Sequence, residues 1–299
     1  MRSVKVNNSS FDLAINFKHT QELRASFNRL TEAIYGFSFE DWYQLGYWGD
    51  RYIPYSLLDG QRVVSNVSVN VIEFVIAGEK KTGVQIGTVM TDTKYRNLGL
   101  NKFIMKQVLD EWKTKSDFIY LFANDRVLDL YPMFGFKVVD EYQHSSLITA
   151  NFIDSKVKKL NMDDEKDRAF LVDTINKSVP VSKLSMRDNA SLQLFYCTSI
   201  LKNHVYYVDA YKSVVIAEFK GDTLYLHDVF TTVSSGLNNI IAAMAKKNTK
   251  KVVFGFTPLD ATDYECTLLK EEDTTLFILK DQLDFFRDKK WMFPVLSHA

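Results

Sequence analysis

The sequence predicts an α+β fold: a mixed, mostly antiparallel sheet flanked by helices, followed by a second, degenerate lobe of the same kind. Two observations predict this class. An apolar strand pattern at Val84–Met90 leads through a short turn into an amphipathic helix at Asn101–Trp112 and then into a strand pattern at Phe118–Phe122. After Glu141, helices, a run of strands, a helix and a strand return in the same order.

The elements before this unit are a helix and a group of strands. Gln21–Tyr35 carries Leu, Phe and Ile on one helical face, and Gly36 follows as a stop signal. Val63–Ile76 is rich in Val and Ile, so we expect two strands of a meander leading to the strand at Val84–Met90.

The segment between them, residues 37–58, is too aromatic for a solvated loop. One interpretation is that the rings pack as a helical cap on the core. The other is that they form the wall of a substrate pocket, because aromatic faces interleaved with carboxylates suit a cationic amine. In the second interpretation Trp42 and Trp48 contact the substrate.

The turn at Thr91–Leu100 is typical of an anion site. The first N–H groups of a helix have no partner inside the helix, and the helix dipole favours negative charge there. Gly99 lets the backbone approach an anion closely because it has no Cβ. A Gly is also found in such turns for packing reasons alone. The interpretation as an anion site therefore depends on the unit of elements that follows in the sequence.

That unit follows the strand at Phe118–Phe122. Asn124–Phe134 reads as a loop and short helix broken by Pro132, and Gly135 turns the chain into another strand.

Two motifs now resemble the GNAT superfamily of acyl-CoA-dependent N-acetyltransferases. Arg96–Asn101 is similar to the Arg/Gln-x-x-Gly-x-Gly/Ala turn of that family, and Leu130–Phe136 is similar to its Tyr-x-x-x-Gly-Phe segment, about thirty residues later. The resemblance covers roughly residues 20 to 145. Asn101 departs from the family, which has Gly or Ala there, so its side chain either crowds a pyrophosphate or donates to it.

The resemblance implies a site for acetyl-CoA as co-substrate. The pantetheine arm would lie along the strand end and the pyrophosphate on the turn. The residues implied in cofactor binding are Val89, Met90, Thr91, Arg96, Asn97, Leu98, Gly99, Leu100, Asn101 and Asn124. For Asn124 the alternative is a cap at the start of the loop.

Tyr131 is the residue that the resemblance makes the general acid, which protonates the leaving thiolate. A phenol is fully protonated at neutral pH and can serve in this way. The alternative is a core aromatic residue beside Phe134 and Phe136.

The base that takes the proton from the amine is less defined. Glu73, in the middle strands, is a candidate substrate contact and base. The segment Trp291–Leu296 is apolar, so we expect the tail to dock. In relatives of this family that have two lobes in tandem, the carboxylate of the last residue enters the active site. This resemblance makes the carboxylate of Ala299 a catalytic candidate and His298 a lesser one.

The second half repeats the element order. The predicted helices and strands are Asp163–Asn176, Asp188–Ile200 with Asp188 as N-cap, Val205–Val208, Ser213–Phe219, Thr223–Phe230, Gly236–Lys247 and Lys251–Phe256. Gly236–Ile241 also echoes Gly99–Ile104. The second turn lacks the Arg, and no Tyr-x-x-x-Gly-Phe segment follows.

We therefore expect a catalytic domain at residues 1–145 and a non-catalytic lobe at residues 146–299. Such a tandem resembles the enhanced-intracellular-survival type of acetyltransferase.

Composition restricts the partners. The 299 residues include 37 basic and 37 acidic side chains, so no general attraction to nucleic acid or anionic membranes is expected. Cys197 and Cys266 read as structural thiols, and five scattered histidines predict no metal site. The start of the sequence shows no signal peptide and no stretch is long enough to span a membrane, so a cytoplasmic location is expected. The oligomeric state stays open.

Three functions remain in view. The first is transfer of an acetyl group from acetyl-CoA to a primary amine by direct attack. The second is a non-catalytic CoA-binding regulatory or scaffold protein, and the third is a binding module without CoA. The amine is a small molecule or a peptide: an amino sugar antibiotic, a polyamine, a protein N-terminus or a lysine.

Overall fold

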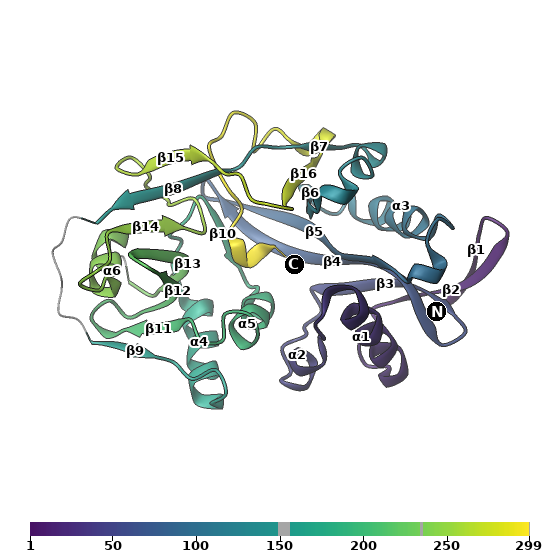
Figure 1. The fold of residues 1–299 in the computed structure, drawn as a ribbon, viewed down its shortest axis with the longest axis horizontal. Helices are drawn as coiled ribbons and strands as arrows, with labels where there is room; N and C mark the ends of the chain where they lie inside the picture. Colours follow the sequence, from purple (N-terminus) through teal and green to yellow (C-terminus); the bar gives the residue numbers. More distant parts are fainter. Residues whose placement is uncertain (149–155, 234–235, 299) are drawn as a thin grey trace.

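The computed structural model describes residues 1–148, 156–233 and 236–298, which form two sheets with helices packed on them (Figure 1). The first sheet has the strand order β1 (Arg2–Val6), β2 (Ser9–Ile15), β3 (Tyr52–Asp59), β4 (Arg62–Ile76), β5 (Glu79–Thr91), β6 (Phe118–Ala123), β16 (Thr275–Leu279) and β7 (Phe136–Val138). A further strand, β10 (Leu184–Arg187), pairs with the end of β4. Only β5 and β6 run parallel among these described pairs, which confirms a mixed, mostly antiparallel sheet.

Helices cover both faces of the first sheet. Because side chains alternate along a strand, neighbours point to opposite faces. Leu57 packs in the cluster that contains the apolar face of α3 (Leu100–Trp112), whereas Leu58 packs in the cluster of α1 (Gln21–Tyr35) and α2 (Glu40–Gln44). The helix α3 connects the two parallel strands β5 and β6.

The second sheet repeats this plan. Its strand order is β15 (Glu265–Leu268), β8 (Tyr142–Leu147), β14 (Lys251–Phe254), β13 (Thr223–Thr231), β12 (Ser213–Lys220), β11 (Val205–Val208) and β9 (Val157–Lys159). The helices of this half are α4 (Glu165–Lys177), α5 (Ala190–Thr198) and α6 (Leu237–Met244). β13 and β14 are parallel, and α6 connects them as α3 connects β5 and β6.

The two sheets exchange strands. β16 comes from the last part of the chain, yet it lies between β6 and β7 in the first sheet. β8 follows β7 in sequence, yet it lies between β14 and β15 in the second sheet. Each lobe is therefore completed by chain from the other half, and the division into residues 1–145 and 146–299 stays a prediction.

Three local predictions differ from the structure. Residues 62–76 form the single strand β4 instead of two strands, because its polar residues bond within the sheet: Asn66 donates to Ser68 Oγ and to Thr88 O, both at 2.9 Å. Asp188 does not cap α5, since Asn189 precedes the helix and no side-chain cap bond forms. The strands β1, β2, β3, β8, β9, β10, β15 and β16 were not predicted. None of the described helices has the length and apolar character to cross a membrane.

Candidate active site

The first lobe opens where its two parallel strands separate. β5 and β6 pair over Gly83–Ile86 and Phe118–Leu121, after which β5 continues to Thr91 and β6 to Ala123 without pairing. The β4–β5 register shifts beside this point, and Thr88 has a positive φ of 48°. Beyond these pairs the two strands are not joined to each other, and we call the place where they separate, with backbone groups of β5 on one edge, the first-lobe opening.

The β5 groups that face the first-lobe opening follow from the alternation along the strand. Asp92 N–H bonds to Val64 O at 2.9 Å, and Met90 O accepts from the Ser65 hydroxyl at 3.3 Å, so residues 90 and 92 face β4. Val89 and Thr91 therefore present their backbone groups to the opening. The Tyr35 hydroxyl, from the last turn of α1, donates to Val89 O at 2.7 Å.

The turn at the mouth of the opening is built from local bonds. Asp92 accepts from Lys94 N at 2.9 Å and begins a short 3₁₀ turn at Thr93–Tyr95. Asn97 and Gly99 then adopt left-handed conformations, with φ of 64° and 78°. Such a φ favours Asn and Gly over other residues, which explains the residue types here.

The start of α3 provides the anion-binding geometry that the sequence predicts. The first bond within the helix runs from Phe103 N to Gly99 O at 3.0 Å, so the N–H groups of residues 100–102 have no partner inside the helix. Leu100 is buried and Leu98 is exposed. Lys94, Arg96 and Lys102 are exposed around this helix start and add positive charge to the helix dipole.

Asn101 is bonded through its side-chain oxygen, and the expected role of its side-chain amide group toward a pyrophosphate stays a prediction. Its Oδ1 accepts from the Ser65 hydroxyl at 2.8 Å, and the same hydroxyl lies 2.9 Å from Thr91 Oγ1. The side chain is thus tied to β4. This bond explains how a larger residue than Gly is accommodated at the first turn of α3.

Tyr131 is buried next to the opening. Its ring packs against Phe277 of β16, with centroids 5.6 Å apart, and against Phe136 at 6.3 Å. Burial, with a smaller contribution from the nearby Tyr35 phenol, raises the pKa of Tyr131 to about 12. Tyr131 belongs to the same hydrophobic cluster against which Val89 packs. The phenol is protonated at neutral pH.

Asn124 is held by the turn that precedes β16. Its side-chain amide donates to Asp273 Oδ2 at 2.9 Å and to Asp273 O at 3.2 Å. Asp125 N donates to the other carboxylate oxygen at 2.8 Å. The side chain makes no cap bond to the 3₁₀ turn that follows. Its role toward CoA stays a prediction.

The tail docks on β6, on the face opposite α3. Phe293 stacks on Tyr120 with centroids 4.1 Å apart, and Tyr120 donates to Ser297 O at 3.2 Å. The His298 ring stacks on Phe122, which lies in the part of β6 beyond its pairing with β5. Burial lowers the pKa of His298 to about 4, so the imidazole is neutral. Ala299 lies outside the described residues.

Three candidate substrate residues occupy other positions. Trp42 and Trp48 are buried and stack on each other, with their indole N–H groups bonded to Ser191 O at 2.9 Å and Tyr52 O at 3.2 Å. Glu73 lies opposite Arg187 of β10, on the paired half of the sheet and away from the opening. Their roles as substrate contacts stay predictions.

The second lobe contains an equivalent opening, filled by the chain itself. β13 and β14 pair over Thr223–Leu226 and Lys251–Phe254, and β13 then continues to Thr231. The segment 179–183 runs between the separated strands: Val179 N bonds to Thr231 O on one side, and Leu259 N bonds to Val181 O on the other, both at 2.8 Å. An extended chain thus fits an opening of this type by hydrogen bonds to both edges.

The described residues contain no group of three or more His, Cys, Asp or Glu side chains that could hold a metal ion. The chemistry that the first-lobe opening itself offers comes from an extended backbone edge, a helix start with positive charge, and a protonated phenol.

Comparisons with solved structures give the class of fold. The chain resembles a conserved protein of unknown function from Enterococcus faecalis V583, described as a probable N-acyltransferase, with a TM-score of 0.56, 15% identity, and coverage of 94% of this chain and 75% of that one. Eis1 from Mycobacterium abscessus has a TM-score of 0.55, 12% identity, and coverage of 89% and 72%.

A GCN5-related N-acetyltransferase from Kribbella flavida has a TM-score of 0.56, 15% identity, and coverage of 90% and 71%. At these identities the three likenesses concern the fold alone, and they cover about nine tenths of the chain, including both of its sheets. No curated protein matches the chain in sequence.

The sequence itself, compared with models of protein families, gives one match. Residues 18–139, less than half of the chain, match the family model described as an acetyltransferase (GNAT) domain. Sequence reasoning found the turn and Tyr131 but missed Tyr35 and Phe277. An apolar run at Thr275–Leu279 was a signal for β16, but nothing in it indicates that it pairs with β6.

Proposed function

We propose that the protein transfers an acetyl group from acetyl-CoA to a primary amine. The observation that carries this proposal is the first-lobe opening, which combines an extended backbone edge at Val89 and Thr91, the helix start at Gly99 and the protonated Tyr131. The family supports acyl transfer in general. The donor, the amine and the roles of individual residues are the proposal.

The helix start would bind the pyrophosphate through the N–H groups of residues 97–101, with Arg96 nearby. The pantetheine arm would lie along Val89–Thr91 as an additional strand. The second lobe supports this arrangement, because segment 179–183 lies between its separated strands in that manner.

In the reaction the neutral amine attacks the thioester carbonyl carbon, the C–S bond breaks, and Tyr131 donates its proton to the departing thiolate sulfur. The amine proton passes to a base, for which the carboxylate of Ala299 stays the candidate. The docking of the tail beside Phe122 supports a base from this segment. Neutral His298 is the other acceptor in the same segment.

Two measurements test the proposal. Acetyl-CoA at a hundred times its dissociation constant should add about 2.7 kcal/mol to the unfolding free energy. Release of free CoA should then be measured with a panel comprising an amino sugar, a polyamine, a peptide N-terminus and a lysine peptide. Stabilisation without CoA release by any amine would favour a non-catalytic CoA-binding protein, and the absence of stabilisation would remove CoA altogether.

Tyr131→Phe tests the acid. We expect acetyl-CoA affinity to be kept and turnover to fall about 10²-fold or more, the usual scale for loss of a general acid. Tyr196→Phe, a buried phenol of α5 outside the opening, is the matched control and should leave turnover unchanged. Equal turnover in Tyr131→Phe and wild type would contradict the assignment.

A further inference from the structure

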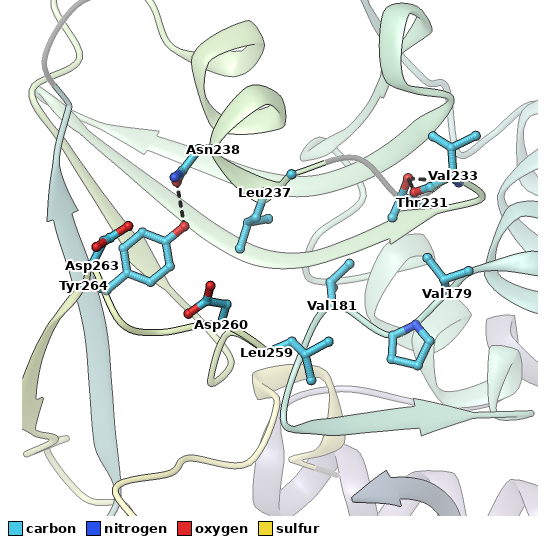
Figure 2. Close-up of a pocket in the computed structure, with 12 residues that line it drawn as sticks. Val179, Val181, Thr231, Val233, Leu237, Asn238, Leu259, Asp260, Asp263 and Tyr264 are labelled. Atoms are coloured by element: carbon cyan, nitrogen blue, oxygen red, sulfur yellow. Dashed lines mark hydrogen bonds between the residues drawn. The ribbon is translucent and has the colours of Figure 1, made fainter. Parts of the chain in front are cut away.

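The second lobe has a cavity of about 400 Å³ beside the segment that fills its opening. Figure 2 shows apolar side chains on two sides of this space, with Leu237 of α6 facing Val181 and Leu259. The cavity lies at the end of β13 and the start of α6. In the first lobe the corresponding position, between β5 and α3, is the anion turn.

The charge of this second-lobe cavity is opposite to that of the first-lobe turn. Its twelve lining residues include Asp260 and Asp263 and contain no Lys or Arg. Both carboxylates are close enough to the Tyr264 hydroxyl to raise its pKa, although burial is the larger cause. Lys183 is a cation near Asp260, and it lies outside the lining.

The balance of charges around this cavity excludes a phosphate ligand. The start of α6 carries the equivalent of about half a positive charge, whereas the two carboxylates carry two negative charges. The Asn238 side chain at this helix start is also engaged, since its Oδ1 accepts from the Tyr264 hydroxyl at 2.6 Å (Figure 2). The space that would hold a pyrophosphate in the first lobe is therefore acidic and partly apolar here.

We propose that this cavity is a binding site for a small organic cation, an ammonium group carried on an apolar body. The apolar body packs between Leu237 and Leu259, and the ammonium group lies at Asp260. In Figure 2 the Asp260 carboxylate lies between the Tyr264 ring and Leu259, whereas Asp263 lies on the other side of that ring. Asp260 Oδ1 accepts from Thr262 N at 3.1 Å and from Thr262 Oγ1 at 2.7 Å, so its Oδ2 is the oxygen offered to the ammonium group, and Asp263 adds a second negative charge to the lining.

The test uses 2-phenylethylamine as the probe and 2-phenylethanol as its neutral analogue, in calorimetric and ligand-detected NMR titrations without CoA. We expect the amine to bind about tenfold more tightly than the alcohol. Asp260→Asn should weaken amine binding about threefold to tenfold, because an attraction between charges that are close to water is modest. Asp263→Asn should weaken amine binding less than Asp260→Asn does. Asp110→Asn, an exposed carboxylate on α3, is the charge-matched control and should bind like wild type.

Three outcomes would overturn the proposal: no amine binding up to the solubility limit, equal affinities for amine and alcohol, or undiminished amine binding in the Asp260→Asn/Asp263→Asn double variant. The last result would place the amine elsewhere, such as the acceptor site of the first lobe. Because the proposal does not involve CoA, it stands or falls independently of the transferase function.

Discussion

The Tyr35 hydroxyl donates to Val89 O. Among the β5 carbonyl groups that face the opening, this is the one for which a side-chain donor is described. Burial raises the pKa of Tyr35 to about 12, so the phenol remains a donor at neutral pH. A pantetheine amide that bonds to the same carbonyl competes with this hydroxyl wherever the two donors cannot share its two lone pairs. Tyr35 then opposes cofactor binding by the strength of one hydrogen bond, and its ring borders the same space as Tyr131.

Tyr35→Phe should therefore bind acetyl-CoA more tightly than wild type. A hydrogen bond contributes about 0.5–1.5 kcal/mol net, which corresponds to about twofold to tenfold in affinity. Calorimetric titration measures the change, and Tyr225→Phe on β13 is the control. Weaker binding in Tyr35→Phe would mean that the hydroxyl helps to hold the cofactor instead.

Charge at the helix start can be tested at Gly99. Any side chain is strained at its φ of 78°, so a single substitution would confound strain with charge. Gly99→Glu and Gly99→Gln share the strain and differ in charge. We expect Gly99→Glu to lose acetyl-CoA binding in a calorimetric titration and Gly99→Gln to retain more of it. Equal losses would show that shape, not charge, dominates at this position.

At the scale of elements, the tail holds the outer face of β6. Phe293 is fully buried and stacks between Tyr120 and Phe286, and its N–H bonds to Glu141 Oε1 at 2.8 Å. These contacts fix the path of the following residues to His298 and Phe122. The position of any base from the tail therefore depends on this one ring.

Phe293→Ala should destabilise the protein by about 3–5 kcal/mol, the usual cost of a buried Phe. Chemical unfolding measures this loss. Phe170→Ala, which removes a ring that is 39% exposed on α4, is the control and should cost much less. Similar losses in the two variants would indicate that the tail is not packed as described.

The helices α1, α3 and α6 and the strands beside the two motifs were predictable, but half of the sixteen described strands and the pairing between strands were not. The amphipathic pattern of residues 101–112 and the motif around Tyr131 depend on a few neighbouring residues, so the sequence displays them directly. The pairing of β16 with β6 joins residues about 150 positions apart. Tyr35 is a site residue only because α1 ends beside Val89, and a tyrosine at the end of a helix carries no sign of that.

For the whole molecule, two buried carboxyl groups make stability depend on pH. Burial raises the pKa of Glu141 from 4.5 to about 8 and that of Asp228 from 3.8 to about 7. The native state then holds protons that the unfolded state has released, so stability falls as pH rises through these values. Buried His298, with its lowered pKa, acts in the opposite sense, but only below its ordinary value of 6.5.

The melting temperature should consequently fall between pH 6.5 and 8, where the carboxyl groups act alone among these three. Glu141→Gln keeps an acceptor for Phe293 N–H and should flatten this slope, measured by thermal unfolding in a pH series. Glu165→Gln, an exposed residue of α4, should keep the slope of wild type. An unchanged slope in Glu141→Gln would mean that this carboxyl ionises without cost.

The exchange of strands between the two sheets also determines when the first sheet can be completed during translation. During translation the N-terminal lobe emerges first, but β16 and Phe277, which supports Tyr131, appear only near residue 279. Until then β6 and β7 lack the strand that joins them. A ribosome that stops early therefore releases a chain with an open sheet edge, suited to chaperone capture or degradation, and without the ring that packs against Tyr131.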